Sequence, residues 1–556
     1  MEKRSALTSK KIEEILGSGY GIEEVLKDFI EFDNPEFLVS VMERYEKEKV
    51  LEYLPQIVNI FFYTNENPEF SKVFYRIIDF GHAAALDLFW TFWSFSENKP
   101  DLNQSVLLGL EKRIVDGSGS NNKSLYAIKD IEESESIRKR NRLEYFEYQK
   151  DFVNSLKQIS IDLIGQVEYT QVFLTSFLMQ LENSIVEKRL THSTSHCKYT
   201  KQLYRGLILS IFNENYTQQI VRILPEESIP LRTRAKVPYL LVVETLDLNE
   251  LEIFGSPKKL PGLNLTQDPF FEFFTESWQH KSARVQQTSP FGQYSSWALR
   301  GFLIKANDDL RQERLAMQVI SKCHQIFAAN DLRIYLRPYT IMPIDSNSGL
   351  IEYIPNSISL HSLKSTYSNF TLAEAFLALW PYNFSQAQEN FARSMAGYSL
   401  ISYILSLKDR HNGNILLDNE GHLIHIDFGF FLNSSPGNMG FESAPFKLTD
   451  EMIDLMGGLE GEMFKLFKGL LCEGFLKIRE KLDEICGFVE IMANGSGFQC
   501  FGDGDKVVFE LRERFFPGLE SGDLLVKVGE IIEGSARNWR TNVYDLYQNK
   551  VNGIFR

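Results

Sequence analysis

The sequence predicts an α+β protein in which a helical N-terminal region precedes a domain with a strand-rich first half and a helical second half. Apolar residues recur at helical spacing through residues 1–110. Strand-length runs rich in β-branched residues begin near residue 236 and continue to about residue 355. Helical patterns return after residue 356, interrupted by one short pair of strand-like segments.

Composition excludes several classes of protein. The chain has 556 residues, of which 44% are hydrophobic and 24% charged, as in ordinary globular proteins of several domains. A net charge of −15 argues against a general nucleic-acid binder. The five cysteines are scattered without a CxxC motif, which favours a reducing, cytoplasmic compartment. Because no run of eighteen apolar residues occurs, we expect a soluble protein with only peripheral membrane contact.

Three segments precede the strands. Residues 1–110 predict a helical accessory domain of short, stacked antiparallel helices. Residues 111–150 contain the flexible stretch Gly117–Asn122 and opposed charged runs, so they predict a flexible charged linker. Residues 151–234 predict a helical segment that leads to the second domain.

Strand-like runs then alternate with turns. The run from Lys236 to Glu244 is the first predicted strand, and residues 245–283 predict a loop-rich insertion. Ser289–Gly292 and the run that ends in Lys305 predict a strand, a turn and a strand. Further predicted strands cover residues 334–339, residues 340–344 and a segment that stops at Pro355.

The stretch Leu405–Phe431 carries the chemistry around which we expect the protein to be organised. Asn414 follows Asp409 by five residues, and Asp427-Phe428-Gly429 comes later. Two apolar runs around Asn419-Glu420-Gly421 predict a hairpin that brings Asn414 and Asp427 back to one place. Protein kinases use this set to orient a hydroxyl and to hold magnesium on ATP.

The order Asp409-Arg410-His411-Asn412, with Asn414, resembles the catalytic loop of the phosphatidylinositol 3- and 4-kinases, which runs Asp-Arg-His-Asn-x-Asn. The sequence from Lys408 to Ser435, and onward to Gly458-Leu459, is similar to the type III beta branch of the 4-kinases. This resemblance is strong over about residues 235–556 and faint before them. It implies a two-lobed, protein-kinase-like catalytic domain, with the N-lobe and hinge at residues 235–355 and the C-lobe at residues 356–556.

The expected site residues lie on both halves of that domain. A buried lysine near ATP needs an anion to hold it, and we expect Glu313 to orient Lys305 toward the phosphates. Oxygens of Asn414 and Asp427 are expected to bind Mg²⁺, with Mn²⁺ as the alternative. Three further groups complete the expectation: Asp409 or His411 as the base, His425 near the γ-phosphate, and Ser289 over the phosphates. The resemblance also implies that adenine meets the hinge at Glu352, Tyr353 and Ile354.

The segment after Asp427 bears on the substrate. No Lys or Arg occurs between Gly429 and Phe446, whereas a site for a phosphorylated inositol ring should offer cations. We therefore expect phosphatidylinositol itself, with Lys447 meeting its diester phosphate. The residues alone leave the 3- and 4-hydroxyls open, and the resemblance implies the 4-hydroxyl.

The C-terminal segment predicts a membrane contact. Apolar residues at positions 539, 543, 546, 547 and 551 lie on one face of a helix with basic neighbours, a pattern typical of interfacial helices. Packing of that face against the C-lobe is the alternative. The resemblance further implies a Golgi or other endomembrane location and a small GTPase of the Rab type, or a Golgi adaptor, bound by the helical domain. A 3-kinase, a protein kinase and a catalytically weak scaffold remain as rival functions.

Overall fold

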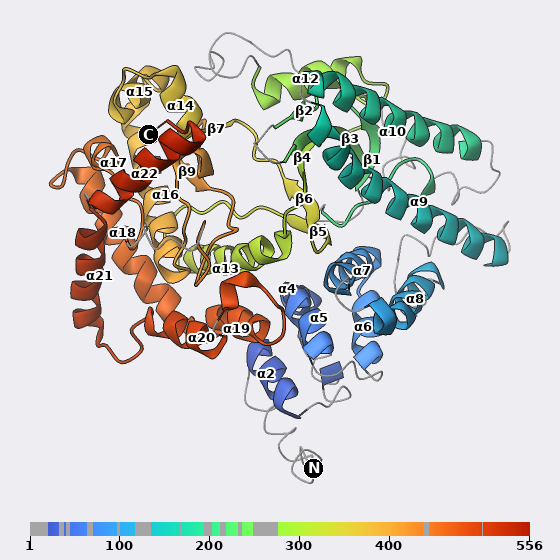
Figure 1. Cartoon of the computed structure of the whole chain (residues 1–556), viewed down its shortest axis with the longest axis horizontal. Coiled ribbons are helices and arrows are strands. Elements are labelled where there is room, and N and C mark those ends of the chain that lie inside the picture. Colours follow the sequence, from blue (N-terminus) through green and yellow to red (C-terminus); the bar gives the residue numbers. More distant parts are fainter. Residues whose placement is uncertain are drawn as a thin grey trace. The chain divides into compact units, whose positions relative to one another are not determined.

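The computed structural model describes residues 21–32, 38–39, 45–63, 70–96, 100–116, 135–166, 168–193, 203–211, 218–231, 236–247, 276–436, 444–502, 504–536 and 538–555 (Figure 1). The chain divides into two compact units. Unit 1 comprises Met1–Asn264, Gln279–Arg314 and Tyr339–Ile354, and unit 2 comprises Leu265–Trp278, Leu315–Pro338 and Pro355–Arg556.

Unit 1 begins with short helices, as the apolar spacing predicts. They are α2 (Ile22–Phe32), α4 (Lys47–Glu52), α5 (Leu54–Tyr63), α6 (Ser71–Ile78), α7 (His82–Ser96) and α8 (Pro100–Asp116). Phe61, Phe74 and Phe92 from three of these helices meet with ring centroids 5.4–5.5 Å apart. These aromatic contacts form a core for the helical module.

Two long helices follow, α9 (Glu135–Asp162) and α10 (Thr170–Ser193). Residues 135–150 were predicted to belong to a flexible linker, and the structure corrects this. They form the first half of α9 because Tyr145 and Phe146 are buried and Lys150 pairs with Glu111 of α8 at 2.9 Å. The Gly117–Asn122 stretch lies outside the described residues.

The sheet of unit 1 is antiparallel, in the order β1-β3-β4-β6-β5, with β2 paired to β3. Its strands are β1 (Gln218–Ile223), β2 (Ile229–Pro230), β3 (Tyr239–Asp247), β4 (Ala298–Ala306), β5 (Ile341–Asp345) and β6 (Ser348–Glu352). The predicted strands near residues 236–244, 297–305 and 340–344 are thus confirmed as β3, β4 and β5. Helices α9, α10 and α7 contact β4, β1 and β5 respectively.

Two sequence predictions in this region are wrong. The described end of the expected loop-rich insertion is helical, since α12 (Trp278–Thr288) leads directly into the Ser289 turn, so no strand precedes that turn. Residues 334–338 form no strand either. Pro338 lacks an amide, and the amides of Tyr335 and Arg337 bond to Arg393 O and Tyr398 Oη of a helix instead.

That helix, α16 (Phe384–Ile404), is the buried centre of unit 2. A side chain at Gly397 would place its Cβ 2.5 Å from Tyr335 O, so glycine allows the close approach of the extended segment. Around it lie β7 (Ser357–Ser359), α14 (Leu360–Thr366), α15 (Leu372–Leu379), β8 (Ile415–Asp418), β9 (Leu423–His425), α17 (Asp450–Leu455), α18 (Glu462–Arg479), α19 (Leu482–Ala493), α20 (Gly504–Glu513), α21 (Ser521–Ser535) and α22 (Trp539–Asn552). The long helix α13 (Leu310–Ala329) starts in unit 1 and continues into unit 2. No helix in the described part of the chain is long and apolar enough to span a bilayer.

A half-buried carboxylate of unit 1 is sensitive to pH. Glu182 Oε2 on α10 accepts a hydrogen bond from the Ile223 amide at 2.7 Å. Burial raises the pKa of Glu182 to about 7, against the opposing effects of that bond, Arg189 and Arg222. The folded state therefore retains this proton to a higher pH than the unfolded chain does.

We expect Glu182→Gln to remove this pH dependence. In the wild type, the stabilisation from the raised pKa is fully present below about pH 4.5 and is lost as pH rises through about 7. After allowance for partial exposure, the free energy of unfolding of the wild type should fall by about 1–2 kcal/mol relative to the variant over this range. Chemical denaturation of both proteins at intervals from pH 4.5 to 8 measures the difference. A difference that is independent of pH would contradict the assignment.

Candidate active site

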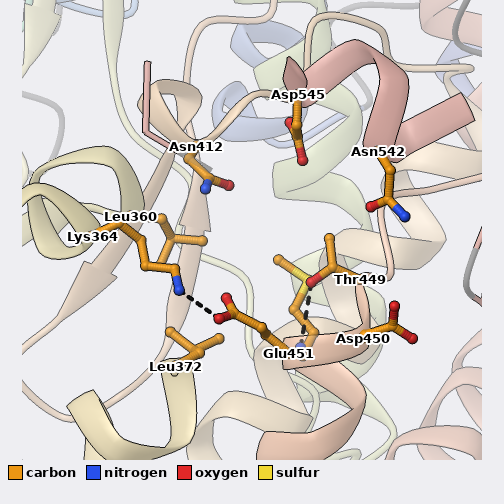
Figure 2. Close-up of a pocket in the computed structure, with 10 residues that line it drawn as sticks. Leu360, Lys364, Leu372, Asn412, Thr449, Asp450, Glu451, Asn542 and Asp545 are labelled. Carbon is orange, nitrogen blue, oxygen red and sulfur yellow. Dashed lines mark hydrogen bonds and ion pairs between the residues drawn. The ribbon is translucent and has the colours of Figure 1, made fainter. Parts of the chain in front are cut away.

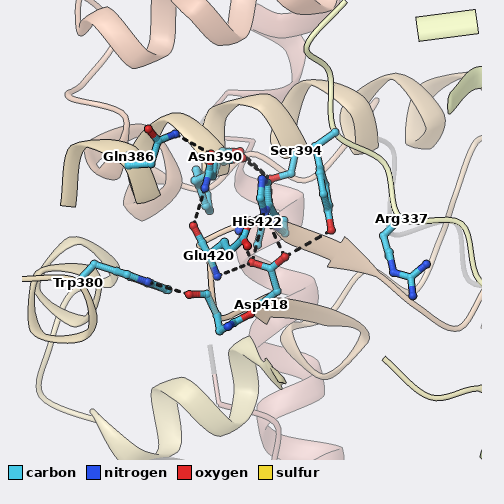
Figure 3. Close-up of polar contacts among 12 residues, drawn as sticks. Arg337, Trp380, Gln386, Asn390, Ser394, Asp418, Glu420 and His422 are labelled. Carbon is cyan, nitrogen blue, oxygen red and sulfur yellow. Dashed lines mark hydrogen bonds and ion pairs between the residues drawn. The ribbon is translucent and has the colours of Figure 1, made fainter. Parts of the chain in front are cut away.

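The predicted hairpin forms, and its turn is firmly fixed. Strands β8 and β9 pair with Ile415 opposite His425, and the Ile426 amide donates to Asn414 O at 3.1 Å. At the turn, Asp418 Oδ1 accepts the amides of Glu420 and His422, both at 2.9 Å (Figure 3). The hairpin therefore places Asn414 and Asp427 at the end opposite the turn, as the sequence predicts.

Helices α15 and α16 hold the same turn from outside, as Figure 3 shows. Trp380 Nε1 donates to Asn419 O at 3.1 Å, and Asn390 Nδ2 donates to Glu420 O at 2.8 Å. Ser394 Oγ accepts the Leu423 amide at 2.8 Å. Because three side chains of the helical core bond to hairpin backbone, the strands cannot slide without losing these bonds.

At the other end, Arg410 joins the two segments that carry the acidic residues. Its guanidinium donates to Lys408 O and Ile426 O at 2.9 Å each, and also to Asp427 O. Asp409 and Asp427 both have left-handed backbones, with φ of 61° and 59°. Non-glycine residues adopt this conformation at a cost, and such strain clusters at functional sites.

The Asp409 carboxylate is surrounded by hydrogen-bond donors. Asn414 Nδ2 lies 3.1 Å from Asp409 O and 3.4 Å from its Oδ2. Oδ1 accepts the hydroxyl of Tyr544 and, at 3.3 Å, the amide of Gln548. Tyr544 and Gln548 lie one turn apart on α22, so the last helix of the chain fixes the orientation of this carboxylate.

His411 lies beside Asp409 but is oriented differently. Its Nδ1 accepts the Gly413 amide at 3.1 Å, so the neutral ring carries its proton on Nε2, 3.7 Å from Asp409 Oδ1. Burial lowers the pKa of His411, and nearby Arg410 and Lys447 lower it further, whereas Asp409 and Asp427 act in the opposite sense. The ring is therefore neutral at pH 7.

Asn414 and Asp427 have the donor chemistry of a magnesium site. The Asn414 amide nitrogen bonds to Asp409, which leaves its oxygen for a hard cation, and Asp427 adds a carboxylate. Among the described residues, no group of three His, Cys, Asp or Glu side chains could hold a metal. A pair of protein oxygens completed by phosphate oxygens and water is the usual pattern for Mg²⁺.

Unit 1 brings together the expected phosphate clamp. Lys305 is on β4, and its Nζ lies 3.9 Å from Glu313 Oε2 and 3.8 Å from Asp308 Oδ2. The Tyr339 hydroxyl donates to Glu313 Oε1 at 2.7 Å. Since Glu313 is only 3% exposed, this bond holds its carboxylate in a fixed direction.

Ser289 has a different local role from the one expected. Its hydroxyl donates to Glu244 and accepts the Phe291 amide at 3.0 Å, so it shapes the turn rather than extending away from it. Glu244 is fully buried on β3 and also binds Trp297 Nε1 at 2.8 Å and Arg222 at 3.0 Å. The amides of Ser289 and Gly292 are also bonded, to Val285 O at 2.9 Å and to Ser289 O at 3.2 Å, so the expected contact of this turn with the phosphates stays a prediction.

The predicted hinge residues end the sheet of unit 1. The Glu352 amide donates to Thr340 O at 2.9 Å, and the Tyr353 amide donates to Gly301 O at 3.0 Å. Glu352 Oε2 accepts the Thr340 amide at 2.9 Å. Ile354, the last residue of the segment, is buried. The amides of Glu352 and Tyr353 are thus used within the sheet, which leaves their contact with adenine a prediction.

Two expected residues of unit 2 are buried. Lys447 donates to both Asp545 oxygens at 2.8 Å and to Asn412 Oδ1 at 3.0 Å, so its charge is neutralised within the protein. His425 stacks on Tyr398 with ring centroids 4.7 Å apart, and burial lowers its pKa well below the usual range. A neutral His425 brings no positive charge to a phosphate. The roles predicted for both residues remain predictions.

A pocket of about 230 Å³ lies next to the loop of residues 409–414 (Figure 2). Its lining comes from α14, α15, α17, α22 and the loop itself: Leu360, Lys364, Leu372, Asn412, Thr449, Asp450, Glu451, Met452, Asn542 and Asp545. Lys364 pairs with Glu451 at 2.6 Å, and Asp545 pairs with Lys447. Much of the charge around the pocket is therefore already neutralised.

Sequence reasoning missed the side of α22 that contacts the loop. Tyr544, Asp545 and Gln548 are buried, whereas the predicted apolar stripe, at positions 539, 543, 546, 547 and 551, is exposed. The spacing of Tyr544 and Gln548, four residues apart on the face opposite Trp539, was the available signal. Residues of the stripe are 37–66% exposed, so the described residues do not bury this face.

Comparison with known proteins agrees with this geometry. Residues 300–378 and 373–497 match the family model described as "Phosphatidylinositol 3- and 4-kinase". A "Phosphatidylinositol 4-kinase" of Dictyostelium discoideum is 45% identical over 288 residues, which are 51% of this chain and 24% of that protein. "Phosphatidylinositol 4-kinase beta" is 43% identical in Xenopus tropicalis and 42% in Homo sapiens, each over 292 residues, 52% of this chain and 36% of the relative. The chain thus matches about a quarter to a third of the length of these relatives. Residues 300–497 are thus similar to the domain that the phosphatidylinositol 3- and 4-kinase family model describes.

Proposed function

We propose that the chain is a lipid kinase that transfers the γ-phosphate of ATP to the 4-hydroxyl of phosphatidylinositol and so produces phosphatidylinositol 4-phosphate. The observation that carries this proposal is the group of Asp409, Asn414 and Asp427, brought to one end of the hairpin and held by Arg410. The names of the similar proteins, phosphatidylinositol 4-kinase and its beta form, support the lipid substrate.

In this proposal the catalytic domain is a two-lobed kinase. The antiparallel sheet of unit 1, with Lys305 and Glu313, is its N-lobe, and the helical unit 2 is its C-lobe. The proposal keeps residues 235–355 as the N-lobe and hinge. It also keeps residues 1–110 as a helical accessory domain. Lys305 binds the phosphates, and Glu313, fixed by Tyr339, orients it.

Asp409 is the better candidate than His411 for the group that accepts the hydroxyl proton. Both nitrogens of neutral His411 are committed, since one accepts the Gly413 amide and the other carries the proton. The Asp409 carboxylate has further acceptor capacity, and its donors fix its orientation. His411 then serves to shape the loop through its bond to the Gly413 amide.

Asn414 and Asp427 would hold Mg²⁺, with Mn²⁺ as the alternative. When bound, the ion would supply positive charge to the phosphate oxygens of ATP. The protein residues fix that charge in place, because Asn414 is bonded to Asp409 and the Asp427 carbonyl to Arg410.

The choice of the 4-hydroxyl as the acceptor rests on the resemblance of the segment after Asp427 to that of the 4-kinases. A phosphatidylinositol 3-kinase is the alternative. The absence of Lys and Arg between residues 430 and 446 supports an unphosphorylated inositol ring. Met439 and Phe441, two apolar residues of the same segment, lie outside the described residues. The pairing of Lys447 with Asp545 further lowers the positive charge that this segment offers.

Location and partners complete the proposal. The exposed apolar face of α22 would contact the membrane, with Trp539, 66% exposed, as its anchor. We propose a peripheral association with Golgi or other endomembranes. The helical module of unit 1 would bind a small GTPase of the Rab type or a Golgi adaptor.

The first test is a kinase assay with radiolabelled ATP, magnesium and vesicles that contain phosphatidylinositol. We expect label on the 4-hydroxyl after deacylation and isomer separation. Asp427→Ala should lower the rate by more than about 100-fold, because the loss of its carboxylate weakens binding of the magnesium ion that would balance the phosphate charge. Asp505→Ala, an exposed position on α20, is the control and should retain full activity. Label on the 3-hydroxyl would favour the 3-kinase alternative, and no lipid product would favour a GTPase-binding scaffold.

Two loop variants separate the candidate bases. Asp409→Asn should lower kcat by about 100-fold or more, since proton acceptance is worth this much. His411→Gln, which can still accept the Gly413 amide, should lower kcat much less. Steady-state kinetics on phosphatidylinositol vesicles measure both. A larger loss in the His411 variant would reverse the assignment.

The membrane role of α22 is tested by vesicle sedimentation. Trp539→Ser with Tyr547→Ser should weaken binding to phosphatidylinositol vesicles by at least about tenfold, because two exposed aromatic side chains no longer enter the interface. Phe509→Ser on α20, which removes an equally exposed aromatic, is the matched control. Equal binding of both variants would refute the role of this face.

A further inference from the structure

Helix α7 carries a stripe of polar residues on an otherwise mostly apolar helix. Between Ala83 and Phe95 most side chains are apolar, but Asp87, Thr91 and Ser94 recur at spacings of four and three residues. Residues at these spacings lie on one face of a helix. Thr91 and Ser94 are almost fully buried, which is costly for polar groups unless they are bonded.

The partner of this stripe is the first turn of α13. Arg314 donates to Thr91 Oγ1 at 2.8 Å and to the two Asp87 carboxylate oxygens at 3.1 and 3.0 Å. Arg311 donates to the backbone carbonyl of Ser94 at 2.9 Å, and its guanidinium lies 5.2 Å from the centre of the Phe95 ring. The Ser94 hydroxyl itself donates to Thr91 O within α7 at 2.8 Å. Two arginines three residues apart thus bind α7 by four hydrogen bonds.

The same turn of α13 carries Glu313. On its sheet side the turn is held by Leu310, which packs so closely on β6 that a Cβ at Gly349 would lie 2.9 Å from Leu310 Cδ1. On its other side the two arginines hold it against α7. A rotation or shift of this turn would move the Glu313 carboxylate away from Lys305, which lies 3.9 Å from it.

We propose that α7 positions the phosphate clamp: its bonds to Arg311 and Arg314 hold the first turn of α13 so that Glu313 faces Lys305. Asp87, Thr91 and Arg314 are positioning residues, since they act through Glu313. The inference rests on the proposed function, because it assigns Lys305 to the phosphates of ATP. It makes the helical module part of the nucleotide site rather than a separate support.

The test compares two aspartate–arginine pairs of the same module. Asp87→Ala and Arg314→Ala break the pair that reaches α13. Asp79→Ala breaks the pair between Asp79 and Arg113 at 3.3 Å, which joins the end of α6 to α8 and does not reach α13. Affinities for ATP and for adenosine are measured on the full-length proteins by calorimetry, together with the melting temperature of each.

We expect Asp87→Ala and Arg314→Ala to weaken ATP binding by about tenfold and to leave adenosine binding nearly unchanged, because adenosine has no phosphates for Lys305. The double variant should lose no more than either single variant, since the two residues act as one unit. Asp79→Ala should leave the ratio of the two affinities unchanged. Should Asp87→Ala or Arg314→Ala fail to fold, Thr91→Val removes a single bond and should still lower ATP affinity selectively.

Equal losses of ATP and adenosine affinity, or no loss beyond that of Asp79→Ala, would overturn the proposal and leave α7 a purely structural support. The measured affinities for ATP and adenosine do not depend on whether a lipid is phosphorylated. A wild-type protein that bound ATP without phosphorylating phosphatidylinositol would refute the proposed function, while the comparison of variants would still decide this inference.

Discussion

The guanidinium of Arg410 is the interaction on which the candidate site depends. It bonds three backbone carbonyls, on Lys408, Ile426 and Asp427, and it is almost fully buried. These carbonyls belong to the two segments whose acidic residues adopt left-handed backbones. Without the guanidinium, three partly buried carbonyls would lose their donor, and the strained backbones would lose their support.

Local sequence patterns predicted the structural features that depend on residues close together in the sequence. The five-residue spacing of Asp409 and Asn414, and the turn at Asn419–Gly421, were enough to place Asn414 and Asp427 together through the hairpin. Helical spacing likewise predicted the short helices of unit 1 and the exposed stripe of α22. In these cases the spacing of apolar residues, or the distance of a residue from a turn, determines the local structure.

Long-range pairing could not be predicted in the same way. Tyr544 and Asp409 are 135 positions apart in the sequence, and Arg314 and Asp87 are 227 positions apart. No local pattern around these residues indicates which of them will form a contact. Lys447 looked like a free cation because its partner Asp545 is 98 positions away. The predicted strand at residues 334–339 failed for a related reason, since its amides bond to a helix that approaches only because residue 397 is glycine.

The two faces of α22 also set a limit on how this segment can change. Tyr544 and Gln548 bond to Asp409, while Trp539 and Tyr547 face outward. Successive residues of a helix are rotated by about 100°, so one inserted or deleted residue near Asn542 would turn every later side chain by that angle. Such an indel would move Asp545 away from Lys447 and Gln548 away from Asp409. The length of this helix is therefore as constrained as its composition, even though it lies at the very end of the described chain.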